Sequence, residues 1–220
     1  MKNGLTLFLG VFATLAISWA VLLLAAHRQL GSLPQFKDPV DEVLHPQPLS
    51  GIAEQGRLVY QDLGCATCHT QQVRREDFGG DIKRHWGERP GYARDYLRDK
   101  VVLFGQSRLG PDLRNVGARI PEAEYYYKLL YAPESKMGGQ PIAHGMPAHK
   151  FLFEERPLNG NQPSYKAIKL PSEFAPAGNV EVVPTARAEA LVAFLLNLKD
   201  TYDYPVERSL NAAATTTGGH

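Results

Sequence analysis

The chain lacks several features that mark common classes of protein. Among its 220 residues there are only two cysteines, Cys65 and Cys68, so a framework of several disulfide bonds is excluded. The 24 Lys and Arg residues nearly balance the 23 Asp and Glu residues, so the chain lacks the basic excess that nucleic-acid binding needs. A composition of 44% hydrophobic and 21% charged residues is not that of a disordered chain. We therefore expect a folded protein that does not bind nucleic acid.

Only one long hydrophobic run is present, from Leu5 to Ala26, and it contains neither a charged residue nor a proline. As an α-helix it would extend over about 33 Å, enough to cross a hydrocarbon layer of about 30 Å. Trp19 near its end and Arg28 just after it are typical of residues at a membrane interface. Residues 1–30 are therefore predicted to form a single transmembrane anchor.

A cleaved signal peptide is the alternative interpretation of this segment. Lys2 supplies a basic residue at the start, and Ala25 and Ala26 are small enough to precede a cleavage site. However, the hydrophobic run is longer than the about 7–15 residues usual in a signal peptide, and Leu24 disrupts the A-x-A pattern. An uncleaved anchor is favoured.

The remainder of the chain divides into three predicted parts. Residues 31–50 hold four prolines and little periodicity, which favours an extended linker. Residues 51–203 are predicted to form one domain, and residues 204–220 a flexible C-terminal tail that is rich in small side chains. The 16 prolines and 20 glycines exceed the needs of a helical bundle, so the domain should contain long ordered loops.

Three segments of this domain have the pattern of short helices, which predicts a mainly α fold. Residues 52–63 place their apolar side chains close to one face. Residues 121–131 begin with proline and carry acids in the first turn, and residues 185–199 begin with a capping threonine before an apolar stripe. We expect the last of these helices to pack against the first.

The motif Cys65-Ala66-Thr67-Cys68-His69 is the strongest chemical signal in the sequence. The spacing C-x-x-C-H allows two thiols to form thioethers with the two vinyl groups of one haem, while the adjacent imidazole becomes the proximal iron ligand. The motif therefore predicts one covalently attached haem c, held by Cys65 and Cys68, with His69 on the iron.

Other uses of this cysteine pair are weaker interpretations. A structural zinc site needs four ligands, and only His144 and His149 are spaced to complete a Cys₂His₂ set. A thioredoxin-like redox pair would need a preceding strand, whereas residues 59–64 are predicted to be helical. Two buried thiols without a function are the remaining alternative.

A low-spin haem that transfers electrons needs a sixth iron ligand, and a thioether raises its reduction potential relative to a second imidazole. Met146 precedes Pro147, which stiffens an extended loop able to hold the sulfur over the haem. Met137 lies in a more flexible stretch, and Met1 would lie across the membrane. Met146 is favoured, and the other open candidates besides Met137 are three histidines: His85, His144 and His149.

The turn Gly110-Pro111-Asp112-Leu113 lies between the C-x-x-C-H motif and Met146. The carbonyl of Pro111 in this position can accept the Nδ1–H of His69, which would fix the imidazole tautomer and strengthen it as a donor to iron. We therefore predict that Pro111 supports His69.

With these residues in place, the chain resembles a class I cytochrome c and, more closely, the monohaem subunit II (FixO type) of cbb3-type cytochrome c oxidases. The resemblance is carried by the single N-terminal span and by three runs: GCATCHTQQVR (64–74), GQSRLGPDLRNVG (105–117) and GMPAHKFLFE (145–154). It covers most of the chain between about residues 52 and 199. Two departures are Gln72 and Arg75, where the family more often has Met and Pro, and residues 158–183 are longer than a minimal domain requires.

This resemblance implies a set of site residues. Cys65 and Cys68 would attach the haem, His69 and Met146 would be the axial ligands, and Pro111 would support His69. Three arginines are candidates for charge-assisted hydrogen bonds to the haem propionates: Arg74, Arg108 and Arg114. Iron with a His/Met ligand pair has no open position, so this chain would transfer electrons and would not itself reduce oxygen.

The resemblance also implies partners and a location. The haem would relay electrons to a catalytic haem-copper subunit, and another c-type cytochrome subunit is a candidate partner. Haem c is attached on the outer side of the bacterial cytoplasmic membrane, so the domain would be periplasmic and Lys2 would mark the cytoplasmic end. The alternatives are a free-standing anchored electron shuttle and the electron-accepting subunit of a periplasmic dehydrogenase.

Overall fold

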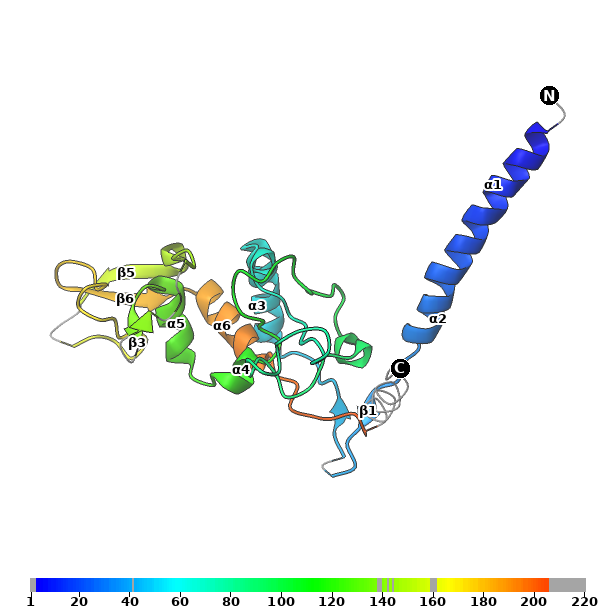
Figure 1. The fold of residues 1–220 in the computed structure, drawn as a ribbon. Coiled ribbons are helices and arrows are strands. Elements are labelled where there is room, and N and C mark those ends of the chain that lie inside the picture. The colour runs from blue at the N-terminus through cyan, green and yellow to red at the C-terminus, as the bar shows by residue number, and fades with distance from the viewer. Residues whose placement is uncertain are drawn as a thin grey trace. The chain divides into compact units, whose positions relative to one another are not determined.

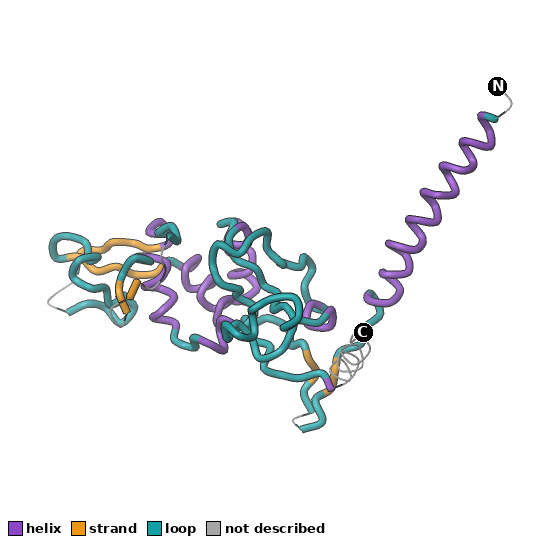
Figure 2. Tube along the Cα trace, in the orientation of Figure 1, coloured by secondary structure: helices purple, strands orange, loops and turns teal. Residues whose placement is uncertain are grey.

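The computed structural model describes residues 3–205 except 41, 138–139, 142, 144 and 159–161 (Figure 2). The chain separates into two compact units, which are described one at a time. Unit 1 contains residues 1–47, 92–99 and 206–220, and unit 2 contains residues 48–91 and 100–205. The sequence predicted one uninterrupted domain over residues 51–203. In the structure, residues 92–99 belong to unit 1 because they pack with the linker.

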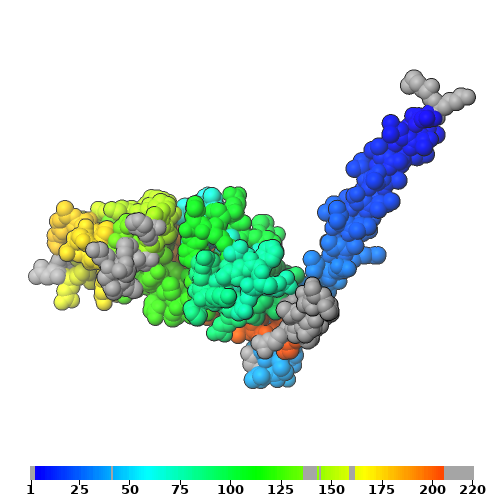
Figure 3. All heavy atoms as spheres, viewed as in Figure 1, coloured from blue at the N-terminus to red at the C-terminus, as the bar shows by residue number. Residues whose placement is uncertain are grey.

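One long helix forms the start of unit 1. It consists of α1 (Gly4–Trp19), a π-helical segment η1 (Ala20–Ala25) and α2 (Ala26–Leu30), drawn in blue in Figure 1. Together they make the one described helix that is long and apolar enough to cross a membrane. None of its side chains is fully buried, whereas the core helix of a soluble protein is mostly buried; Figure 3 draws the side chains of this helix in blue. The predicted anchor is therefore present as a helix.

The linker that follows contains a small hairpin that the sequence did not predict. Strand β1 (Phe36–Lys37) pairs antiparallel with β2 (Leu44–His45). The short helix η3 (Ala93–Tyr96) lies in the segment that joins this unit, where Arg94 donates to the carbonyl of Pro34. Backbone pairing and this arginine contact give order to a segment expected to be extended throughout.

Two helices of twelve residues form the centre of unit 2, α3 (Gly51–Asp62) and α6 (Ala186–Asn197). Each begins at a hydroxyl cap: Ser50 accepts from the amide of Ala53 at 3.3 Å, and Thr185 accepts from that of Ala188 at 3.4 Å. They pack directly on each other, since a Cβ added to Gly56 would lie 1.8 Å from the carbonyl oxygen of Ala190. The predicted pairing of the first and last helices is confirmed.

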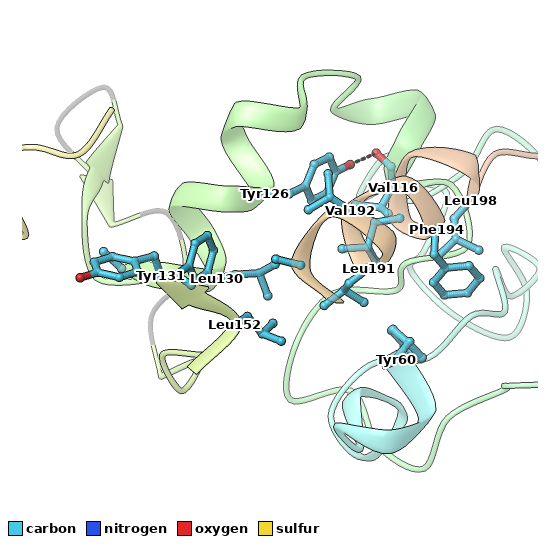
Figure 4. Close-up of a cluster of buried hydrophobic side chains, with 14 of the residues drawn as sticks. Tyr60, Val116, Tyr126, Leu130, Tyr131, Leu152, Leu191, Val192, Phe194 and Leu198 are labelled. Carbon is cyan, nitrogen blue, oxygen red and sulfur yellow. Dashed lines mark hydrogen bonds between the residues drawn. The ribbon is translucent and has the colours of Figure 1, made fainter. Parts of the chain in front are cut away.

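The hydrophobic core extends from this helix pair to two shorter helices, α4 (Val116–Arg119) and α5 (Ala123–Tyr131) (Figure 4). The Tyr126 hydroxyl donates to the carbonyls of Val116 and Ile120 at 2.9 and 2.7 Å, which ties α5 to the end of α4. The ring of Tyr60 meets that of Phe194 edge-on at 5.4 Å. The predicted helix at 121–131 is confirmed, and it begins two residues later than expected.

Strands occupy the region after α5. Strand β3 (Lys136–Met137) pairs with β4 (Gln140–Pro141). After the short helix η4 (Lys150–Leu152), β5 (Phe153–Pro157) pairs antiparallel with β6 (Val180–Pro184). The stretch 158–183, longer than a minimal domain needs, is thus largely the connection of this hairpin. The fold is mainly helical with few strands, as predicted.

Tyr204, where the predicted tail would begin, packs against the domain. Tyr204 is 1% exposed, and the guanidinium of Arg89 lies 5.0 Å from the centre of its ring. Arg89 also donates to the carbonyl of Tyr202 at 2.8 Å. This cation–π contact explains why Tyr204 belongs to the folded unit, and residues 206–220 lie outside the described residues.

Candidate haem site

The C-x-x-C-H motif forms a tight turn directly after α3. Gly64 has a φ of +69°, a conformation that glycine adopts at little cost, and it redirects the chain into the short helix η2 (Cys65–Thr67). The amide of His69 donates to the carbonyl of Cys65 at 3.0 Å. Cys65 and Cys68 are half-buried free thiols at the two ends of this single turn. The two thiols are therefore separated by a single turn of the chain.

A second loop, residues 104–114, runs alongside the motif, and we call it the strap. Backbone hydrogen bonds join the strap to residues 66–71 at 2.8–3.1 Å. The donor and acceptor pairs are Gln106 to Ala66, Gly110 to Cys68, Leu113 to Thr70 and Gln71 to Phe104. These bonds fix both loops to each other on each side of His69.

The strap also contacts the imidazole of His69. Its Nδ1 lies 2.9 Å from the carbonyl oxygen of Pro111. A carbonyl only accepts, so Nδ1 carries the proton and Nε2 keeps the lone pair that a metal requires. Gly110 lies against the same ring, where an added Cβ would be 2.2 Å from Cε1. The absence of a side chain at Gly110 is what allows this close approach.

Asp112 connects the two loops through its side chain. The carboxylate is fully buried, and its Oδ2 accepts from the Thr70 hydroxyl at 2.6 Å and from the Gln72 amide at 2.8 Å. Its Oδ1 accepts from the amide of Arg114 at 2.9 Å. Three hydrogen bonds therefore compensate the cost of burying this charge.

Two of the predicted propionate contacts, Arg74 and Arg108, share a second buried carboxylate, Asp81. Arg74 approaches it at 3.1 Å, and Arg108 at 2.5 Å. Arg108 also donates to the carbonyl of Gln72 at 2.6 Å and lies over the ring of Trp86. Burial opposes ionisation of Asp81, but the hydrogen bonds from the two arginines outweigh it and lower its pKa to about 2.

The third predicted arginine, Arg114, is paired elsewhere. Its Nε lies 2.5 Å from Oδ2 of Asp200, and both side chains are largely buried. The structure thus brings Arg74 and Arg108 together beside the strap, while Arg114 joins the strap to the end of the domain. That any of them contacts a propionate stays a prediction.

Met146 lies in a loop on the same hydrophobic core that Cys65 contacts, and its side chain is partly buried there. The preceding Gly145 has a φ of +78°. Its amide donates to the Glu134 carboxylate at 3.2 Å, and the amide of His149 donates to the carbonyl of Leu130 at 2.7 Å.

The rival ligands differ in placement. His85 is exposed, and His149 is half-buried, where burial lowers the pKa of its ring. The side chain of Met137 and all of His144 lie outside the described residues.

The donor set fits a haem better than a bare metal ion. Within the residues that the structure describes, no group of three His, Cys, Asp or Glu side chains is arranged to hold a metal ion. Burial raises the pKa of the Cys65 thiol to about 11, which disfavours the thiolate that zinc would need. One oriented imidazole, two thiols on one turn and a thioether on the adjoining core are the groups that a haem c uses.

Sequence reasoning missed two buried aspartates beside the C-x-x-C-H motif, Asp81 and Asp112. Asp112 was visible only as part of a turn, and Asp81 lies in a loop without periodicity. The sequence does contain a signal for Asp112, because this residue directly follows Pro111, which is predicted to contact His69. For Asp81 no local pattern pointed to Arg108, which follows it only after a long loop.

Comparison with known families agrees with this geometry. A model of the family described as cytochrome c oxidase, mono-heme subunit/FixO, matches residues 6–171, well over half of the chain. No curated protein sequence matches the chain significantly. The family carries one haem and belongs to an oxidase complex, and the N-terminal apolar helix fits a single-pass anchor. The chain therefore belongs to the FixO family, the mono-haem subunit II of cbb3-type cytochrome c oxidases.

Proposed function

We propose that this chain relays electrons to the catalytic haem-copper subunit of the oxidase through one covalently attached haem c. The observation that carries the proposal is the 2.9 Å contact between Nδ1 of His69 and the carbonyl of Pro111, beside two thiols on one turn. This arrangement prepares an imidazole to bind iron through Nε2.

Each residue of the candidate site has its own proposed role in binding the haem. Cys65 and Cys68 would attach it through thioethers, and His69 and Met146 would supply the imidazole and thioether ligands of the iron. Held by these residues, a haem would supply a centre for one-electron transfer. Pro111 keeps the proton on Nδ1 of His69, and the thioether of Met146 keeps the potential higher than a second imidazole would. Cys65 and Met146 both pack against the hydrophobic core that α3, α5 and α6 form, and such an apolar shell limits the access of water to a bound cofactor.

Arg74, Arg108 and Arg114 are proposed to contact the propionates. The guanidinium groups of Arg74 and Arg108 each have five N–H donors, so their pairing with Asp81 leaves donors for a further carboxylate. Arg108 is the most suitable of the three, because it lies on the strap and donates to the carbonyl of Gln72, close in sequence to His69.

We place the haem domain on the periplasmic side of the bacterial cytoplasmic membrane, anchored by the helix Gly4–Leu30. Covalent attachment of haem c occurs on that side. A second c-type subunit is a candidate electron donor. Protease added to intact spheroplasts should digest the haem domain, and protection of the domain would contradict this orientation.

Composition of the native assembly tests the function. The complex is purified from its membrane in mild detergent, and its haem types, copper, flavin, quinone and molybdenum cofactor are measured. Haem b and copper together with haem c support the relay to an oxidase. A stable monomer with haem c alone indicates a free-standing shuttle, and flavin, quinone or molybdenum cofactor indicates a dehydrogenase subunit.

A further inference from the structure

We infer that Asp112 is a positioning residue for His69 and thereby sets the reduction potential of the haem. The inference rests on the proposed function, in which His69 binds the haem iron. Asp112 touches neither the ring of His69 nor, in the proposed arrangement, the iron. It acts on the backbone at both ends of the Pro111 contact.

The geometry places Asp112 at the joint between the two loops. Its own amide nitrogen follows the Pro111 carbonyl that accepts from His69. Its carboxylate binds Thr70, which directly follows His69, and Gln72 two residues further along the chain. The donor loop and the acceptor loop of the His69–Pro111 hydrogen bond are therefore fastened together by one side chain.

Further contacts hold Asp112 itself in place. Its Oδ1 binds the amide of Arg114, and its backbone carbonyl accepts from the Arg119 guanidinium at 2.6 Å. The carboxylate is 0% exposed, so water does not compete for these bonds. Arg108 lies 3.7 Å from Oδ2, which places a positive charge beside the carboxylate. These contacts hold the carboxylate in one orientation, and its hydrogen bonds hold both loops in a fixed position relative to each other.

A change at Asp112 should reach the iron through the imidazole. The hydrogen bond from Nδ1–H to a carbonyl makes the imidazole a stronger donor, and a stronger donor stabilises the oxidised iron. If the two loops separate, this bond lengthens, the donor weakens and the reduction potential rises. Loss of partners in the outer shell of a metal typically changes affinity by about 10–100-fold.

Asp112→Asn in the full-length, haem-loaded protein in detergent tests the inference. The amide has one acceptor oxygen in place of two, so the Thr70 and Gln72 contacts on Oδ2 and the Arg114 contact on Oδ1 cannot all be kept. We expect covalent haem to be retained. The ratio of oxidised to reduced haem at a fixed applied potential should fall about tenfold, about 59 mV for a one-electron couple. The Nδ1 proton of His69, followed by NMR in the reduced protein, should exchange with solvent at least tenfold faster.

Two further variants separate positioning from stability. Thr70→Val removes one donor to Asp112 with little change of shape, whereas Thr70→Ser keeps the hydroxyl and should behave as wild type. Asp95→Asn removes a different buried carboxylate, which accepts from the amide of Tyr92 at the start of η3, and should lower thermal stability without changing the potential or the proton exchange.

The outcomes are distinguishable. A wild-type chain without covalent haem overturns the proposed function itself. Wild-type potential and exchange in both Asp112→Asn and Thr70→Val, with covalent haem present, overturn the positioning role and leave Asp112 a structural residue. If Asp112→Asn does not fold, Thr70→Val against Thr70→Ser decides the question in the same way.

Discussion

The two loops that carry the proposed iron ligands are held in different ways. His69 is fixed by polar contacts: the Pro111 carbonyl, the strap backbone and the buried carboxylate of Asp112. Met146 rests on the hydrophobic core, and the polar contacts described around it are made by its neighbours, Gly145 and His149. The polypeptide thus builds the orientation of the imidazole itself, whereas the position of the thioether depends on apolar packing. Loss of each ligand should therefore have different consequences.

The largest effect is expected from His69→Ala. Removal of the imidazole deletes the ligand that the strap orients, and the amount of low-spin haem c per chain should fall at least tenfold. The measurement is the haem absorption spectrum of purified protein normalised to protein content. His85→Asn is the control, because His85 is exposed at a φ of +57°, a conformation that asparagine tolerates. A normal spectrum in His69→Ala would contradict the assignment.

A smaller change is expected on the other side of the haem. Met146→Leu should keep the covalent haem but open the sixth iron position, so that the reduced protein binds carbon monoxide and the reduction potential falls. Met137→Leu should leave both properties unchanged. If Met137→Leu opens the iron and Met146→Leu does not, the ligand is Met137.

Substitution of one glycine in each loop compares the loop of Pro111 with the loop of Met146. A Cβ at Gly110 would lie 2.2 Å from His69 Cε1, so Gly110→Ala should cost about 1–3 kcal/mol of stability and also shift the potential. Gly145 has open space but a φ of +78°, so Gly145→Ala should cost about 1–2 kcal/mol through backbone strain, with His69 undisturbed. Thermal unfolding and redox titration of both variants check this. A potential shifted by Gly145→Ala alone would reverse the comparison.

The last expected effect is a dependence of stability on pH through Asp81. Its pKa is lowered from 3.8 to about 2 in the folded protein, so its ionised form contributes stability above pH 4. That contribution, about 2 kcal/mol, is lost as the pH falls from 4 to 2. Asp81→Asn should remove this component and flatten the fall in stability over the same range, measured by denaturant unfolding at several pH values. An equally steep fall in Asp81→Asn would show that other carboxylates are responsible.

Local patterns were enough to predict the elements that stand around the haem site. Thr185 predicted the start of α6, and the apolar spacing of residues 52–63 predicted α3, because helix caps and helical periodicity depend on residues close together in the sequence. The C-x-x-C-H spacing predicted a haem turn for the same reason. The hydrogen-bond distance between His69 and Pro111 matches the expected geometry, although the two residues are far apart in the sequence.

Interactions between distant loops could not be predicted in this way. The ion pair of Arg108 with Asp81 joins two loops that have no periodicity, so nothing in either loop selects the other. The pairing of β5 with β6 spans a long connection, and short strands of mixed polarity resemble loop sequence. The packing of Tyr204 depends on Arg89, more than a hundred residues earlier. Tertiary contacts decided each of these features.

The central claim is that electrons pass through this haem on their way to the oxidase centre. The most direct measurement mixes the fully reduced, detergent-purified complex with oxygen and follows the haem c absorption by stopped flow. The account predicts that haem c is reoxidised at least as fast as the complex consumes oxygen in steady turnover, and that His69→Ala abolishes this phase. Haem c that stays reduced while oxygen is consumed at the full rate would contradict it.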